Sequence, residues 1–244
     1  MQEQIPRITE LSQGDQNEAL LRNSELGVLL HDAYLTATNI DPRLDDVVIV
    51  PNDSDDSRIA FARHKENTES GNYEVHLRLN DLDKSLALQE NLLNNVQGSR
   101  ELFAGILDIE PDQVTPQLLH VFSILHELGH ITEYMDNEGN EVELQQRMRR
   151  EKAALPIGNT ATSKLMDPSS PAHQAVVENW GQISAQHGVS TMGDLIEKQH
   201  GAYRGMTSEH TADMFAVDVF ATNTQLVDQL NADVETYRDY AIAA

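Results

Sequence analysis

Two histidines and a glutamate lie close together in His126-Glu127-Leu128-Gly129-His130. In a helix, residues i and i+4 project from the same face about one turn apart, so two such imidazoles can reach one metal ion. Glu127 is rotated to the side of that ion, where its carboxylate can accept a proton from metal-bound water. This geometry is the physical content of the H-E-x-x-H motif, and it predicts a catalytic zinc site.

A catalytic zinc ion normally has three protein ligands and one position open to water. The metzincin pattern would place glycine at 133 and histidine at 136, but the chain has Glu133 and Asp136. The best candidate for the third ligand is Glu209, in the segment TSEHTADMFA. Asp213 follows four residues later on the same helical face and could accept an N–H from a ligand histidine. The alternative for both carboxylates is a solvated acidic face.

The motif needs a buried helix to hold it. Thr115-Pro116 provides a cap and a first-turn proline, and the residues that follow are apolar on nearly every side. Polar groups inside such a helix require partners. Gly129 would permit either close packing of another element or close approach of a substrate.

A small sheet is expected before this helix. A first helix over 25–38 precedes three segments with strand character, at 45–51, 57–63 and 72–79. Turn-forming residues between them indicate a mostly antiparallel arrangement. We expect 72–79 to form the sheet edge over the cleft, where an extended peptide could add as a strand.

Helices are expected throughout the rest of the chain, which makes the fold class α+β. The predicted helices are 82–96, 99–108, 141–155, 171–184, 191–203, a helix capped by Thr207 or Ser208 and running to 222, and 225–243, with a loop over 155–171. We expect residues 1–24 to be a polar, partly flexible leader with little to bury. Residues 25–244 should form one domain, with the sheet and motif helix in 25–135 and a helical part with the glutamate helix in 136–244.

The composition excludes several function classes. The 244-residue chain has a formal net charge of −23 and a pI of about 4.6. Such a charge argues against nucleic acid and against anionic membrane surfaces as partners. The absence of cysteine excludes disulfides and thiol catalysis. No segment has the ~20 apolar residues of a membrane span, and the polar N-terminus lacks a secretory signal, so we expect a cytoplasmic protein.

A resemblance to a known family rests on the motif together with Glu209-His210-Thr211-Ala212-Asp213 and the following Met-Phe-Ala. These segments resemble the gluzincin metalloproteases, and the E-x-x-A-D form resembles the minigluzincins and their membrane-embedded relatives. The interval between the two segments is longer than in thermolysin. The resemblance implies a zincin-like fold and Zn²⁺ held by His126, His130 and Glu209, with Glu127 as general base and Asp213 supporting His126.

The expected function is therefore hydrolysis of peptide bonds in a protein or peptide substrate by metal-activated water. An oxyanion also needs a donor besides the metal, and Tyr203, Arg204 and His200 precede Glu209. Tyr203 is the preferred candidate. Two alternatives remain: a regulatory or protein-binding module that zinc stabilises, and a zinc hydrolase that acts on something other than peptides.

Overall fold

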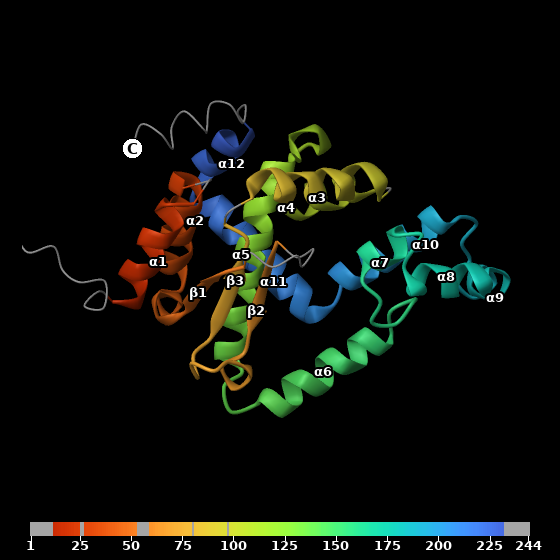
Figure 1. Ribbon diagram of the computed structural model, residues 1–244, viewed down its shortest axis with the longest axis horizontal. Coiled ribbons are helices and arrows are strands. Elements are labelled where there is room, and N and C mark those ends of the chain that lie inside the picture. Colours follow the sequence, from red (N-terminus) through yellow and green to blue (C-terminus); the bar gives the residue numbers. More distant parts are fainter. Residues whose placement is uncertain (1–11, 25–26, 53–58, 80, 97, 232–244) are drawn as a thin grey trace, which may run out of the picture.

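The computed structural model describes residues 12–24, 27–52, 59–79, 81–96 and 98–231. Helices dominate the described part, and they surround one small sheet (Figure 1). The expected α+β class is therefore confirmed, whereas the more specific zincin-like fold stays a prediction.

The sheet has three strands, β1 (Val48–Pro51), β2 (Ala60–Arg63) and β3 (Glu74–Leu77), in the order β1-β3-β2. Strand β3 pairs in parallel with β1 and antiparallel with β2. The prediction of a mostly antiparallel sheet is wrong, since the sheet is mixed. The prediction that 72–79 forms the edge is also wrong, because β3 is central and β2 is an edge. Alternation of apolar residues identifies the two faces of a strand but not its neighbours.

The motif helix is α5 (Pro116–Asp136), and it lies at the centre of the molecule (Figure 1). Its first turn is capped by the Thr115 hydroxyl, which accepts the Leu118 N–H at 3.2 Å. The helix packs against β2, α3 (Leu82–Asn95) and α11 (Thr207–Thr222). Burial on several sides agrees with its nearly uniform apolar pattern.

Gly129 decides how closely α5 and α11 approach. A Cβ atom at this position would lie 2.8 Å from both the Cα and the carbonyl oxygen of Ala212, and 3.0 Å from the Phe215 Cβ. Backbone atoms cannot move aside at low cost, so only glycine permits this packing. Of the two roles expected for Gly129, the structure supports close helix packing.

Of the expected leader over 1–24, residues 1–11 lie outside the described part of the chain and residues 12–24 lie within it. The described residues form α1 (Gln13–Arg22), which begins with a capping box between Ser12 and Asp15. The Asn17 side chain is buried, and its amide donates to the Tyr34 hydroxyl at 2.9 Å and to the Val47 carbonyl at 2.7 Å. These bonds fasten α1 to α2 (Gly27–Ile40) and to the chain entering β1. A single buried polar side chain can thus anchor a helix whose polar composition suggests a solvent-exposed segment.

The remaining elements lie on two sides of α5. The helix α4 (Ser99–Leu107) follows α3, and α12 (Thr224–Asn231) follows α11, while the rest of the predicted last helix lies outside the described residues. After α5, α6 (Glu141–Ala153) runs as an arm to a helical group, α7 (Thr162–Met166), α8 (Pro171–Glu178), α9 (Trp180–His187) and α10 (Met192–Arg204) (Figure 1). This group shares a second, smaller apolar cluster with the end of α3. Short 3₁₀ helices precede β1, connect β2 to β3 and precede α5: η2 (Pro42–Asp46), η3 (Lys65–Asn67) and η4 (Pro111–Gln113).

Two expectations for this second half are corrected. The helix expected over 171–184 is two helices, because the chain breaks at Asn179 between α8 and α9. The expected loop over 155–171 contains the short α7, which buries Leu165 in the second cluster. The helix α7 was not predicted because its few apolar residues, in a segment rich in Pro, Ser and Thr, show no helical periodicity.

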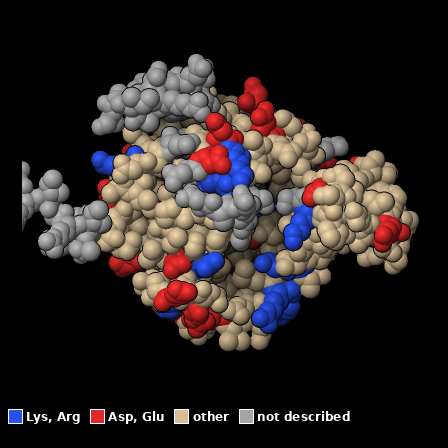
Figure 2. Space-filling view, viewed as in Figure 1, with Lys and Arg blue, Asp and Glu red and all other residues tan. Residues whose placement is uncertain are grey.

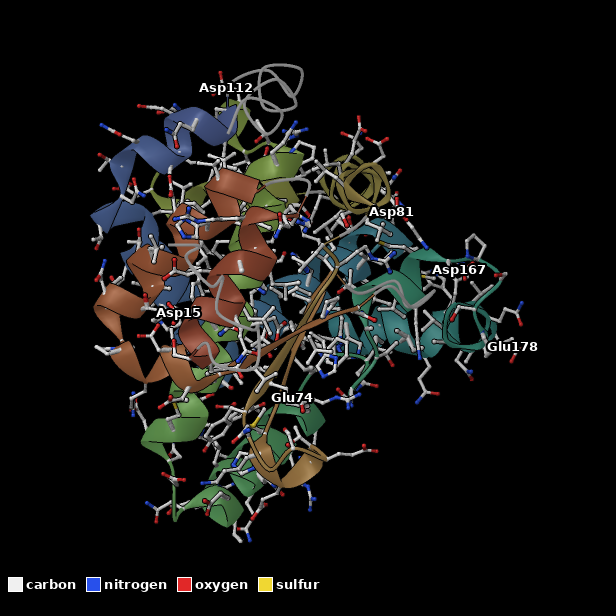
Figure 3. All side chains as sticks on the ribbon, turned by 60° about the vertical axis from the view of Figure 1, so that its left-hand side comes forward. Asp15, Glu74, Asp81, Asp112, Asp167 and Glu178 are labelled. Carbon is white, nitrogen blue, oxygen red and sulfur yellow. The ribbon has the colours of Figure 1, made fainter. Side chains whose placement is uncertain are left out.

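The acidic residues are spread over the surface. Figure 3 labels acidic side chains from different parts of the chain, and they lie far from one another: Asp15, Glu74, Asp81, Asp167 and Glu178. Figure 2 shows one face hollowed near its middle, with Lys and Arg side chains at the edge of the hollow. No described helix is both long and apolar enough to cross a membrane.

Candidate metal centre

Three buried side chains from α5 and α11 meet at one point. His126, His130 and Glu209 are 5%, 7% and 3% exposed, and each offers one potential ligand atom within 4.8 Å of the other two. His126 Nε2 lies 3.2 Å from Glu209 Oε2, and His130 Nε2 lies 3.8 Å from Glu209 Oε1. The carboxylate more than 70 residues along the chain therefore returns to the histidine pair, and the group could hold a metal ion.

The His126 ring is oriented through its other nitrogen. Nδ1 lies 2.8 Å from Asp213 Oδ1, one turn beyond Glu209 on α11. The Arg204 guanidinium donates to the same oxygen, and it lies 5.4 Å and 5.5 Å from the ring centroids of Phe103 and Phe122. Arg204, one of the sequence candidates for an oxyanion donor, therefore holds Asp213 in place.

The His130 ring has a different set of partners. Its Nδ1 lies 3.4 Å from Ser208 Oγ and 3.9 Å from Glu133 Oε2, and the Ser208 hydroxyl donates to that same oxygen. Arg147 of α6 donates to the other Glu133 oxygen. Glu133, Ser208 and Arg147 were not predicted from the sequence to belong to the site. The available signals were that Glu133 follows His130 by three residues and that Ser208 precedes Glu209 directly.

The site favours a positive charge between its carboxylates. Burial by itself lowers the pKa of His130, but contacts with Glu133 and Glu209 outweigh it and raise that pKa to about 10. Burial raises the pKa of Glu209, yet the two histidines outweigh it and hold that pKa well below its usual range.

The residues fit a metal ion on two further grounds. Glu209 Oε2 is buried and makes no hydrogen bond of good geometry to any described residue, although it lies beside His126 Nε2. A buried carboxylate oxygen without a hydrogen bond destabilises the folded state unless a cation binds to it. Two imidazole nitrogens and one carboxylate oxygen also form a donor set typical of zinc, in which tetrahedral ligand atoms are about 3.3 Å apart.

Glu127 lies to the side of this group and contacts the sheet. The backbone N–H of Ala62 in the edge strand β2 donates to Glu127 Oε2 at 2.8 Å. The Glu127 side chain is half-buried, and no described residue donates to its Oε1. One oxygen is thus fixed by the strand, and the other is available for proton transfer.

Two tyrosines lie close to the three candidate ligands, and two histidines that were considered from the sequence lie outside the group. Tyr203 is half-buried on α10, and burial and the nearby Glu209 carboxylate raise its pKa far above the usual range. The Tyr134 ring stacks on that of His130 with centroids 6.4 Å apart. His200 is buried beside Phe103 and His210 is exposed, and neither belongs to the metal-binding group found among the described residues.

Comparisons with known proteins give no relative. No protein-family model matches the chain, and no curated protein and no solved structure is significantly similar to it.

Proposed function

We propose that the protein is a zinc-dependent metalloendopeptidase of gluzincin type. The observation that carries the proposal is the meeting of Glu209 with the Nε2 atoms of His126 and His130 in a buried group. These three residues would hold Zn²⁺, which when bound lowers the pKa of a water molecule and polarises a carbonyl group.

Glu127 would act as the general base. The Ala62 N–H holds one of its oxygens, so the carboxylate is fixed relative to both the edge strand and the ligand histidines. The free oxygen accepts a proton from water and then delivers it to the leaving amine. Tyr203, beside Glu209, would donate a hydrogen bond from its hydroxyl to a developing oxyanion and keep its proton, since burial and Glu209 raise its pKa.

The number of ligands favours an enzyme over a zinc-stabilised binding module. Structural zinc sites are closed by four protein ligands, whereas catalytic sites have three and leave one position for water. In the described part of the chain, the group contains three residues able to ligate through nitrogen or a carboxylate.

The test separates metal binding from catalysis. We expect purified protein to bind one zinc ion and to cleave a peptide library in a chelator-sensitive way. Glu127→Gln should retain stoichiometric zinc and lose cleavage by at least about 10²-fold, since it removes the proton acceptor. Glu209→Ala should lose zinc as well.

The exposed Glu143 on α6 provides a matched control, and Glu143→Gln should change neither property. Tight zinc binding by Glu209→Ala would remove the proposed third ligand. Zinc binding by wild type without cleavage of any peptide would instead support a non-catalytic role.

A further inference from the structure

Two elements that border the candidate metal centre also carry basic side chains. The first is β2, where the Ala62 N–H donates to Glu127 and Arg63 is the next residue along the strand. The second is α6, where the Arg147 side chain donates to a Glu133 oxygen. A chain bound at the centre would therefore pass close to both elements.

The end of α6 is fastened to the centre by side chains one turn apart. Besides Arg147, Glu151 faces the centre, and its Oε1 accepts the backbone N–H of Thr207 at 3.3 Å, at the start of the helix that carries Glu209. Residues between and after these two positions lie on the flanks of the helix, since successive residues turn by about 100°. They include three basic residues, of which two are exposed and one is half-buried: Arg149, Arg150 and Lys152.

These cations have no carboxylate partner. Four residues form what we call the basic rim, and none of them makes an ion pair with another described residue: Arg63, Arg149, Arg150 and Lys152. On α6, the positions three and four residues away from each cation hold no Asp or Glu, so no intrahelical pair can form. The Arg63 guanidinium lies 5.3 Å from the centroid of the Phe61 ring, a contact that orients it without neutralising its charge. Basic residues elsewhere, such as Arg43 and Lys65, are paired with carboxylates.

The dipole of α6 accounts for only part of the basic rim. Cations are favoured in the last turn of a helix, and Arg150 and Lys152 lie there. Arg149 precedes that turn, and Arg63 belongs to a strand. Unpaired cations on two separate elements, both bonded to the same site, are explained together by an anionic ligand at that site.

The surface view agrees with this placement. Figure 2 shows Lys and Arg side chains at the edge of the hollow, over the positions that α6 and the end of the sheet occupy in Figure 1. The basic residues thus border a concave face of the molecule. Such a surface can take an extended chain.

The net charge of −23 opposes anion binding only at long range. The Debye length is about 8 Å at physiological ionic strength, so charges farther away are largely screened. Glu143 lies six residues before Arg149 on α6, about 9 Å along the helix axis at about 1.5 Å per residue. The Glu151 carboxylate is nearer, but it is turned toward Thr207. The rim therefore determines the local potential.

We propose that the basic rim binds an acidic stretch of the peptide substrate, one that flanks the scissile bond. Asp and Glu side chains would accept charge-assisted hydrogen bonds from the rim guanidinium and ammonium groups. This inference deepens the proposed function and rests on it for the identity of the ligand as a substrate.

A polynucleotide would meet the same cations less favourably. Its phosphates repeat along the whole strand, and beyond the rim they would face a surface on which acidic residues greatly outnumber basic ones. A peptide can confine its negative charge to the few residues that reach the rim. An acidic peptide is therefore the ligand that fits both the rim and the rest of the surface.

The first experiment measures binding without cleavage. Full-length, zinc-loaded Glu127→Gln protein is titrated into a labelled dodecapeptide with a central Glu-Glu-Asp-Glu block, or into its Gln-Gln-Asn-Gln counterpart, and anisotropy is followed. We expect about tenfold tighter binding of the acidic peptide at low salt, the sum of several exposed ion pairs. The preference should fade at about 0.5 M salt because the charges are screened.

Variants in the same background locate the effect. Arg149→Gln with Arg150→Gln should remove most of the preference, and Lys at both positions should retain it. The matched control is Arg22→Gln with Lys198→Gln, two exposed residues on α1 and α10 whose loss changes the net charge equally. The control should keep the preference.

Three results would overturn the inference. The first is equal affinity of the two peptides. The second is an equal loss of preference in the control, which would assign the effect to net charge. The third is tighter binding of a labelled single-stranded oligonucleotide than of the acidic peptide, which would make the rim a nucleic-acid surface.

The second experiment measures cleavage by protein that retains Glu127. Peptides that share one cleaved sequence carry the acidic or the amide block before or after it. We expect the acidic block to lower KM and to leave kcat nearly unchanged, since the rim lies outside the reacting atoms. Arg149→Gln with Arg150→Gln should raise KM for the acidic peptide about fivefold and leave the amide peptide unaffected.

The outcomes distinguish the two proposals. Zinc- and Glu127-dependent cleavage with equal KM for both peptides would overturn the role of the rim and leave the peptidase. Rim-dependent binding of the acidic peptide, without cleavage of any peptide, would support the rim as an acidic-peptide surface and overturn the peptidase.

Discussion

Each candidate ligand histidine is oriented through its Nδ1 atom, but by different partners. Asp213 and Arg204 hold His126, whereas Ser208, Glu133 and Arg147 surround His130. Partners of this kind fix the tautomer and direct Nε2 toward the metal. The two networks come from four helices, so the precision of the site depends on how α5, α6, α10 and α11 pack.

At the residue scale, we expect Asp213→Asn to weaken zinc binding by about 10- to 100-fold while leaving the ligand set intact. The amide keeps the size of the side chain but removes the charge that holds His126 Nδ1–H. Competition with a chromophoric chelator measures the affinity.

The control is Asp218→Asn, on the same helix α11 but exposed. It should bind zinc as wild type does. Equal affinities for all three proteins would mean that Asp213 does not position the ring.

At the element scale, the pairing of α5 with α11 determines whether Glu209 reaches the histidines at all. Gly129 sits in this contact, with no room for a Cβ. The other contact that matters is between α5 and β2, through the bond from Ala62 to Glu127. The edge strand β2 thus positions the Glu127 carboxylate, whereas 72–79 had been expected to form the edge at which an extended peptide could add.

We expect Gly129→Ala to lower the free energy of unfolding by about 1–3 kcal/mol, because the added methyl separates α5 from α11. The same displacement should move Glu209 from the histidines and weaken zinc binding. Urea unfolding and chelator competition measure the two effects.

Gly105→Ala is the matched control, since Gly105 lies in α4 and a Cβ there meets nothing within 4 Å. It should be neutral or stabilising by about 0.5–1 kcal/mol, the usual gain of alanine over glycine in a helix. If Gly129→Ala had the same stability and zinc affinity as the wild type, the role assigned to the contact between α5 and α11 would be wrong.

At the scale of the whole molecule, two buried histidines link stability to pH. Burial lowers the pKa of His120 to about 4, and burial together with Arg204 lowers that of His200 to about 4. Between pH 6.5 and 4 the unfolded chain binds these protons and the folded chain does not, so stability falls as pH falls through this window. Above pH 6.5 this contribution is fully present.

We therefore expect His120→Leu to lose less stability than wild type on acidification from pH 7 to pH 4.5. The difference in slope should approach ~1.4 kcal/mol per pH unit below pH 6, which corresponds to one proton. Urea unfolding at a series of pH values measures it. The net charge of −23 affects both proteins alike, so parallel curves would show that His120 is not the group responsible.

The sequence alone determined the features that local spacing controls. The i, i+4 histidines, the capped and apolar α5, the three strand segments and the helix that carries Glu209 could all be predicted, because helical and strand periodicities are local properties. The anchoring Asn17 of α1 escaped the prediction, since its hydrogen bonds to residues 17 and 30 positions away leave no periodic trace. The capping box of α1 is local, between Ser12 and Asp15, and was missed because the polar composition of this segment suggested a leader.

Only the tertiary structure decided which elements are neighbours. It placed β3 between β1 and β2, brought Glu209 to His126 and His130, and recruited Glu133, Ser208 and Arg147 around them. Such contacts join residues far apart in the chain, and their selection depends on packing: Gly129 admits the backbone of Ala212, and no property of either segment by itself reveals that fit.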